Sequence, residues 1–340
     1  MVGRGIVMER VRVGIIGAGM IGELHALAFA QSPLADLVVI CDANRERAKA
    51  VGEKLSVPFV CDPLEVFNFP IEAVVICLPE HLHFATTAKA IEEGKHVLVE
   101  KPLVVDLEEG KHLVQKAKER PDVKAMVGHI LRFDPRYAQA RQMITEGKVG
   151  KLSHFYARRN NRVTDALRIA PRSSSLMYLG VHDLDLMLWY AGSRAKRVFA
   201  LANFGVLKEH GVPDTILGLI EFEGGVLGSM ELSWILPKHY PGAIDGVFEI
   251  VGTKGMIEVK VLDQGLKTIS EDSHWMYPDT MHWPILHGYL EGDLRREVES
   301  FLRCIVYDTP VPVTLEEGLE AVRLAIALEE SYQKGKEIQL

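Results

Sequence analysis

Three glycines and one acidic residue near the start of the chain have a spacing with chemical meaning. Gly17, Gly19 and Gly22 follow the apolar run 11–16, and Asp42 ends the next apolar run about twenty residues later. Gly17 lets the chain turn sharply out of a strand, Gly19 lets the backbone approach a pyrophosphate, and Gly22 lets a helix pack close to that strand. The pattern predicts a βαβ unit that binds a dinucleotide.

The helix that opens after this turn is expected to hold the pyrophosphate at its N-terminus. Met20, Ile21 and Gly22 supply its first main-chain N–H groups, and the helix dipole favours an anion there. Asp42 would accept hydrogen bonds from the ribose hydroxyls and repel a 2′-phosphate, so NAD is predicted rather than NADP. Arg45 lies close enough in the sequence to weaken that preference. The alternative is a glycine-rich turn in another kind of α/β protein.

The segments around the turn alternate between strand and helix patterns. Such an alternation predicts a doubly wound parallel sheet of the Rossmann type. The expected strands are 11–16, 37–41, 71–78, 96–100 and 124–127, and the expected helices are 44–55, 83–93 and 106–120; a further helix is expected at 135–146, after the pattern changes.

The second half of the chain is dominated by strand patterns separated by turn residues. It predicts a largely antiparallel open sheet with helices on one face. The expected strands are 153–159, 197–204, 215–222, 226–234, 248–251 and 256–259, and the expected helices are 179–190, 294–307 and 314–334. We therefore expect a mobile tail at 1–7, an NAD(P)-binding domain at 8–127, and a substrate-binding and oligomerisation domain of the α+β class at 128–340.

Composition excludes several kinds of protein. The net charge of −7 gives no basic face for nucleic acid, and the apolar runs are too short to span a membrane. Cys41, Cys61, Cys77 and Cys304 lack paired spacing, so neither a zinc site nor any other metal site is expected. Unpaired cysteines also favour a reducing, cytoplasmic location.

Three segments follow strands at the edge where open α/β sheets bind ligands. They contain Leu78 and Pro79, then Glu100 and Lys101, then His129. Lys101 stands between a buried strand and Pro102, so its position is fixed, and it could donate a hydrogen bond to a substrate oxygen. The alternative is a lysine bound only to the cofactor or to Glu100.

A second group of candidates lies in the expected helix at 179–190. His182 is flanked by Asp183 and Asp185 within an apolar stretch. A histidine in this setting is either a catalytic acid/base or a core residue with satisfied hydrogen bonds.

Taken together, five motifs resemble one known family over nearly the full length of the chain. It is the glucose–fructose oxidoreductase, inositol dehydrogenase and rhizopine-catabolism (Gfo/Idh/MocA) family. The motifs are Gly17 to Gly22, the stretch 94–102 that contains Glu100-Lys101-Pro102, Arg132 to Pro135, Gly147 to Gly150, and Gly180 to Asp185.

The resemblance implies an NAD(P)-dependent oxidoreductase of sugars, cyclitols or related alcohols. The lysine matching Lys101 contacts the substrate hydroxyl and the nicotinamide ribose, and the bond to Pro102 is often cis. The histidine matching His182 is the acid/base, and His83 matches a position near the cofactor. Inositol dehydrogenase-like members carry an aspartate where this chain has Tyr178. Either Tyr178 takes a polar role, or the usual triad is reduced to a pair.

These observations predict oxidation of a secondary alcohol, with His182 as general base and Lys101 stabilising the alkoxide. A cofactor-binding sensor with reduced catalysis and a keto-sugar reductase remain alternatives. Family members commonly form homodimers or homotetramers through the open sheet. The expected catalytic residues are Lys101, His182 and Tyr178; the cofactor residues are Gly17, Gly19, Met20, Ile21, Gly22, Asp42, Leu78, Pro79, His83, Glu100 and Lys101; and the substrate residues are His129, Arg158 and Asp183.

The arginine-rich run 158–162 leaves the substrate class open. It would suit a carboxylated or phosphorylated sugar, or it is a solvated basic loop.

Overall fold

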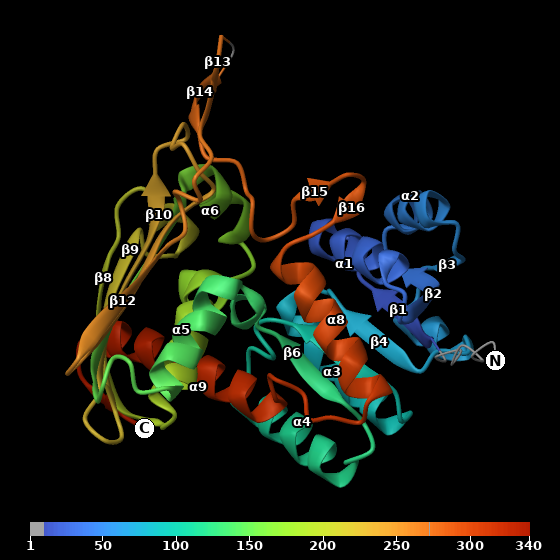
Figure 1. Cartoon of the computed structure of the whole chain (residues 1–340), viewed down its shortest axis with the longest axis horizontal. Helices are drawn as coiled ribbons and strands as arrows, with labels where there is room; N and C mark the ends of the chain where they lie inside the picture. Colours follow the sequence, from blue (N-terminus) through green and yellow to red (C-terminus); the bar gives the residue numbers. More distant parts are fainter. Residues whose placement is uncertain (1–9, 272) are drawn as a thin grey trace, which may run out of the picture. The chain divides into compact units, whose positions relative to one another are not determined.

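The computed structural model describes residues 10–271 and 273–340, so the expected tail at 1–7 lies outside the described residues. The chain forms two compact units (Figure 1). Unit 1 contains the residues up to Ile130 together with His282–Glu316, and unit 2 contains Leu131–Met281 and Glu317–Leu340. The domain boundary expected near 127 is close to this division, but 282–316 joins unit 1 rather than the C-terminal domain.

Helix α8 explains why that segment belongs to unit 1. It spans Asp293–Val306, and its buried apolar side chains include Leu294, Val298 and Phe301. These side chains lie on one face because they recur at helical spacing. The helix packs on α1 and on the first strand of the sheet. The sequence predicts this helix correctly, but no local pattern indicates that the helix packs on unit 1.

Unit 1 is built on a six-stranded parallel sheet in the order β3-β2-β1-β4-β5-β6. The order reverses between β1 and β4, so right-handed crossovers place α1 and α2 on one face and α3 and α4 on the other. The strands are β1 (Val11–Ile16), β2 (Ala35–Cys41), β3 (Phe59–Val60), β4 (Ala73–Ile76), β5 (His96–Glu100) and β6 (Ala125–Gly128); the helices are α1 (Met20–Gln31), α2 (Arg45–Leu55), α3 (His83–Glu92) and α4 (Leu107–Glu119). The predicted doubly wound fold is confirmed.

The central strands are buried on both faces, as their sequences predict. All four residues of β4 are fully inaccessible, and so are Val13, Ile15 and Ile16 of β1. Helices on both faces of a parallel sheet require such continuous apolar strands. This rigid core fixes the positions of the loops that follow the strands.

Unit 2 contains a seven-stranded sheet in the order β12-β11-β7-β10-β9-β8-β17. Every pair in this sheet is antiparallel except β10 with β7. The observed sheet therefore agrees with the predicted, largely antiparallel one. The strands are β7 (Leu152–Arg162), β8 (Ala195–Asn203), β9 (Thr215–Phe222), β10 (Leu227–Leu236), β11 (Ile244–Gly252), β12 (Gly255–Lys260) and β17 (Ile338–Gln339); the helices are α5 (Pro135–Thr145), α6 (Val163–Ile169), α7 (Val181–Ala191) and α9 (Leu315–Lys334).

Helices cover only one face of this sheet. Inward-facing Phe155 and Met230 are buried, whereas Leu217 and Leu219 on the other face are more than half exposed. Short hairpins that the sequence does not predict follow: β13 (Thr268–Ser270) with β14 (Ser273–Met276) in unit 2, and β15 (Ile285–Leu286) with β16 (Tyr289–Leu290) in unit 1.

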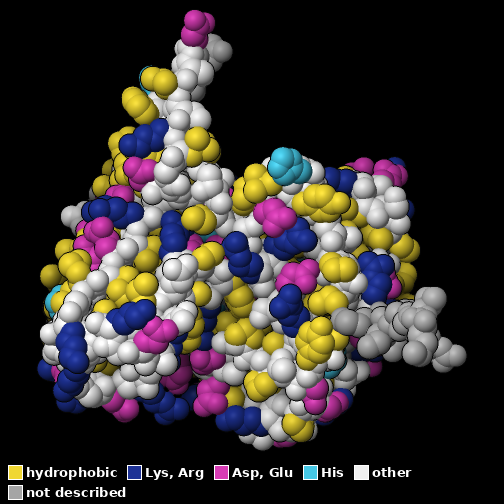
Figure 2. All heavy atoms as spheres, in the orientation of Figure 1, with side chains coloured by type: hydrophobic (Ala, Val, Ile, Leu, Met, Phe, Trp, Pro, Cys, Tyr) yellow, Lys and Arg dark blue, Asp and Glu magenta, His cyan; other side chains and the backbone are white. Residues whose placement is uncertain are grey.

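The surface carries charges of both signs. On the face that Figure 2 shows, lysine and arginine side chains are interspersed with acidic ones. Within the described residues, no helix is long and apolar enough to cross a membrane.

Candidate active site

The glycine turn after β1 is shaped by close backbone contacts. Gly17 has φ +98°, and a Cβ atom there would lie 2.4 Å from the carbonyl oxygen of Cys77. A Cβ atom at Gly22 would lie 1.8 Å from the carbonyl oxygen of Gly17. Both positions therefore exclude any side chain. The turn lies against the end of β4, which is where the strand order reverses and where open α/β sheets bind ligands.

Gly19 has a different environment. A Cβ atom built on it would meet no described atom within 4 Å, and no side chain caps the helix that begins at Met20. The first N–H groups of a helix have no partner within the helix and attract an anion. This open space beside free amides fits the pyrophosphate of a dinucleotide.

Asp42 connects the end of β2 to the glycine turn. Its carboxylate accepts hydrogen bonds from the main-chain N–H groups of Ala18 and Asn44, each at 2.8 Å. The positively charged partner is Arg47, at 3.3 Å, whereas the Arg45 guanidinium lies over the Phe59 ring. Sequence reasoning missed Arg47. The fixed carboxylate still has lone pairs for the ribose hydroxyls.

We expect Asp42→Ala to weaken NAD binding by 10- to 100-fold. Hydrogen bonds to a charged group contribute roughly 1.5–3 kcal/mol, and the variant also loses the bonds that hold the glycine turn. Calorimetric titration with NAD and NADP measures both affinities. Asp36→Ala is the matched control, because Asp36 lies on β2, the strand that Asp42 follows, but pairs with Arg10 at the surface. An unchanged NAD affinity in Asp42→Ala would contradict the assignment.

The loops after β4, β5 and β6 lie side by side at one edge of the sheet. The register pairs Ile76 with Val99, and Glu100 with Gly128. The structure therefore brings the segment 77–79, Lys101 and His129 to neighbouring strand ends, as the sequence predicts. The peptide bond between Lys101 and Pro102 is cis, which confirms that expectation.

His83 holds two of these loops together. Its ring nitrogens lie 2.8 Å from the carbonyl oxygens of Pro102 and Leu78. Burial lowers its pKa, although the two carbonyl groups oppose that shift. Because both nitrogens face main-chain groups, His83 shapes the loops around the cofactor site. This corrects the expectation of a direct cofactor ligand.

Glu100 also acts within the protein. One carboxylate oxygen lies 2.8 Å from Nε2 of His25, and the other accepts from the main-chain N–H of Lys101 at 3.2 Å. Burial alone would raise its pKa, but the hydrogen bond and charge of His25, together with the charge of Lys101, lower it overall. Glu100 is therefore a fixed anion that supports Lys101. A contact between Glu100 and the cofactor stays a prediction, because the carboxylate is partly exposed and keeps lone pairs for further hydrogen bonds.

In unit 2, Tyr178 and His182 lie on either side of a change in helix geometry. Tyr178 belongs to a π-helical turn, Leu176–Gly180, in which the N–H of Val181 bonds to the carbonyl of Leu176. His182 lies in the first turn of α7, and both side chains are half-buried. The Tyr178 ring packs 6.3 Å from that of Trp234. Single π-turns within helices are frequent at functional sites.

The structure contradicts two predicted substrate residues. Asp183 is buried, and its carboxylate forms a two-pronged ion pair with Arg159, at 2.7 and 2.8 Å. Arg158 directly precedes Arg159 on β7, so it points to the opposite face of the sheet, where it pairs with Asp245 at 3.0 Å. Arg162 pairs with Asp165. The arginine run is therefore neither an anion site nor a solvated loop, because each of these charges is neutralised locally.

The arrangement in each unit agrees with comparisons to known proteins. Residues 11–129 match the model of an oxidoreductase family with an NAD-binding Rossmann fold, and residues 137–258 match the C-terminal domain of the GFO/IDH/MocA family. The scyllo-inositol 2-dehydrogenase (NAD(+)) of Bacillus subtilis is 30% identical, with 98% of this chain and 97% of the relative covered. The myo-inositol 2-dehydrogenase of Thermotoga maritima is 25% identical, with 97% and 98% covered.

Solved structures have the same fold. The scyllo-inositol dehydrogenase of Lactobacillus casei, solved with bound NAD(H) and scyllo-inositol, has a TM-score of 0.85 at 23% identity, with 97% of this chain and 99% of that chain covered. The glycine turn, the fixed Asp42 and the full-length similarity lead to one conclusion: the chain is an NAD-dependent oxidoreductase that acts on CH–OH groups, and it belongs to the Gfo/Idh/MocA family.

Proposed function

We propose that the protein oxidises one secondary hydroxyl of a cyclitol of the inositol class to a ketone. The observation that carries this proposal is the full-length similarity to an NAD-dependent scyllo-inositol 2-dehydrogenase. In this chain Lys101 directly follows β5, at the carboxyl ends of the strands of the NAD-binding unit. A neutral polyol also suits a unit 2 whose arginines at 158, 159 and 162 are already paired with acids. We therefore favour inositols over phosphorylated or carboxylated sugars.

In the proposed reaction, each of four residues has a separate role. His182 accepts the proton of the reacting hydroxyl, and Lys101 binds the same oxygen as negative charge develops on it. Tyr178 offers a phenol O–H as a further donor in place of a carboxylate. A bound NAD⁺ would supply the acceptor for the hydride of the carbinol carbon. Glu100 fixes the backbone of Lys101, so the lysine is positioned before the substrate arrives.

A substrate panel tests the proposal. Initial rates with scyllo-inositol, myo-inositol, an acyclic polyol, an aldose and a uronate would be followed by the absorbance of the reduced cofactor, with NAD⁺ and NADP⁺ in parallel. The matching ketones with NADH test the reverse direction. We expect the highest kcat/KM with an inositol and NAD⁺. A clear preference for the uronate or the aldose would contradict the substrate class, and preferential reduction would contradict the direction.

We also propose that a second copy of the chain covers the open face of the unit 2 sheet. Leu201 lies opposite Leu217, and Phe199 lies opposite Leu219, so apolar side chains form adjacent rows on this face. Hydrophobic side chains are also exposed between charged ones on the surface of the molecule (Figure 2). A contiguous apolar patch is unusual on a monomer, and a two-fold contact would bury the same rows from both copies.

We expect sedimentation velocity to show a dimer or tetramer for the wild type and a smaller species for Leu219→Arg. A charge placed within the apolar rows would be buried without a partner in the assembly. Leu64→Arg is the matched control, because Leu64 is equally exposed (59%, against 58% for Leu219) but lies in unit 1. A monomeric wild type at micromolar concentration would disprove the assembly.

A further inference from the structure

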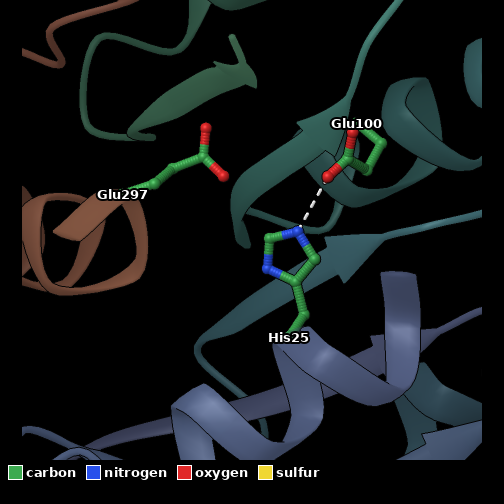
Figure 3. A group of neighbouring side chains, drawn as sticks. All are labelled: His25, Glu100 and Glu297. Atoms are coloured by element: carbon green, nitrogen blue, oxygen red, sulfur yellow. Dashed lines mark hydrogen bonds and ion pairs between the residues drawn. The ribbon is translucent and has the colours of Figure 1, made fainter. Parts of the chain in front are cut away.

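Three ionisable side chains meet inside unit 1, behind the turn that carries Lys101. They are His25 from α1, Glu100 from the end of β5 and Glu297 from α8 (Figure 3). One nitrogen or oxygen atom from each lies within 4.8 Å of those of the other two. His25 and Glu297 have no exposed surface. The cluster thus joins a buried imidazole and a buried carboxyl group to the partly exposed carboxylate of Glu100.

The hydrogen bonds within the cluster are unequal. Both oxygens of Glu100 are engaged, one with the His25 ring and the other with the main-chain N–H of Lys101. In contrast, the two carboxyl oxygens of Glu297 have no hydrogen-bond partner among the residues that the structure describes, and the same is true of Nδ1 of His25. Figure 3 shows the Glu297 carboxyl group pointing toward the space beside Glu100 and His25.

The charges around Glu297 disfavour its ionisation. Burial raises its pKa well above the ordinary range, and the negative charges of Glu100 and Asp293 raise it further. The other ionisable groups nearby are the Cys77 thiol, whose pKa burial also raises, and His282, which lies 2.7 Å from Asp293. A buried carboxyl group beside a carboxylate favours its neutral form, because ionisation would add a second negative charge to the site.

We propose that Glu100 and Glu297 share a single proton, held on Glu297, so that the carboxyl pair presents one negative charge behind Lys101. Glu297 is then a positioning residue that acts through Glu100. The neutral carboxyl leaves the Glu100 anion to hold the His25 ring and the Lys101 main chain. Loss of the proton would place a second charge against Glu100 and disturb the support of Lys101.

The sign of the resulting pH dependence follows from the raised pKa. The unfolded chain ionises Glu297 near its ordinary pKa of about 4.3, whereas the folded chain keeps the proton to a higher pH. The stability that this proton confers is complete below that value and is lost as pH rises toward the pKa of the folded pair. Because the two acids interact, the transition belongs to the pair rather than to Glu297 alone.

The test compares Glu297→Gln, which keeps the shape of a neutral carboxyl group but does not titrate, with the wild type. Glu299→Gln is the matched control, since Glu299 lies on the same helix and is partly exposed. Denaturant unfolding between pH 5 and 9 needs no substrate. We expect the ratio of the folding constants, Glu297→Gln over wild type, to rise about tenfold per pH unit until the pair ionises. For Glu299→Gln the ratio stays flat.

A second, spectroscopic readout observes the proton itself. The infrared difference spectrum of wild type minus Glu297→Gln at pH 7 should show the carbonyl stretch of a protonated carboxylic acid. A flat stability ratio together with the absence of that band would overturn the proposal. A melting temperature that falls on removal of divalent cations in the wild type, but not in Glu297→Gln, would also overturn it, because a cation would then occupy the place of the proton.

The catalytic effect rests on the proposed function, and it is measured separately. We expect kcat/KM of the wild type to fall at least tenfold on the alkaline side as the pair ionises, and Glu297→Gln to lack that fall. If no inositol is oxidised, the proposed function fails. The unfolding and infrared results still show whether Glu297 holds a proton. If kcat/KM of the wild type and of Glu297→Gln fall equally on the alkaline side, Glu297 has no positioning role.

Discussion

Lys101→Met is expected to lower kcat by 10²- to 10³-fold and to leave the affinity for NAD within a few-fold of the wild type. Removal of one donor that stabilises a developing oxyanion has costs of this size. Methionine keeps the length of the side chain and removes its charge. The main-chain N–H of Lys101 donates a hydrogen bond to the Glu100 carboxylate, and this bond does not depend on the Lys101 side chain. We therefore expect the variant to retain the cis turn. Steady-state rates with an inositol and calorimetric titration with NAD measure the two effects.

The control for this variant is Lys101→Arg. Arginine keeps the positive charge but presents a larger, planar group, so we expect partial activity. A wild-type kcat for Lys101→Met would remove the lysine from the reaction. A lost NAD affinity with an unchanged kcat at saturating NAD would instead assign Lys101 to cofactor binding, which is the alternative that the sequence leaves open.

His182→Ala is expected to lower kcat by about 10²- to 10⁴-fold, the range for loss of a general base. The variant should still bind NAD, because His182 belongs to unit 2 and the glycine turn belongs to unit 1. Added imidazole should restore part of the rate if the missing function is proton acceptance. An isotope effect from deuterium on the carbinol carbon would show whether the hydride step limits the residual rate.

Tyr178→Phe is the companion variant for His182. It keeps the ring that packs near Trp234 and removes only the hydroxyl group. A loss that is much smaller than that of His182→Ala would identify the tyrosine as a supporting donor. Full activity in His182→Ala, with no response to imidazole, would remove the histidine from the mechanism.

The sequence predicts the fold well because the relevant patterns are local. Continuous apolar runs mark the buried parallel strands, and Gly17 and Gly22 mark a turn that excludes side chains by backbone contact. Asp42 is placed correctly because the length of a βαβ unit is nearly constant. The family motifs then place Lys101 and His182 on their elements.

The errors come from tertiary partners that no spacing reveals. Arg158 and Asp183 look available in the sequence, but strand alternation and burial pair them with Asp245 and Arg159. The same limit applies to His25 and Glu297, which are 272 positions apart and meet only because α1 and α8 pack together. His83 is a further example, since its bonds to two loops depend on the fold.

The proposed reaction moves a hydride from the carbinol carbon of an inositol to NAD⁺. The most direct test incubates the protein with NAD⁺ and scyllo-inositol that is fully deuterated on carbon, followed by mass spectrometry of the reduced cofactor. We expect reduced cofactor that carries one deuterium. Reduced cofactor without deuterium, or none at millimolar inositol in a preparation that binds NAD, would contradict it.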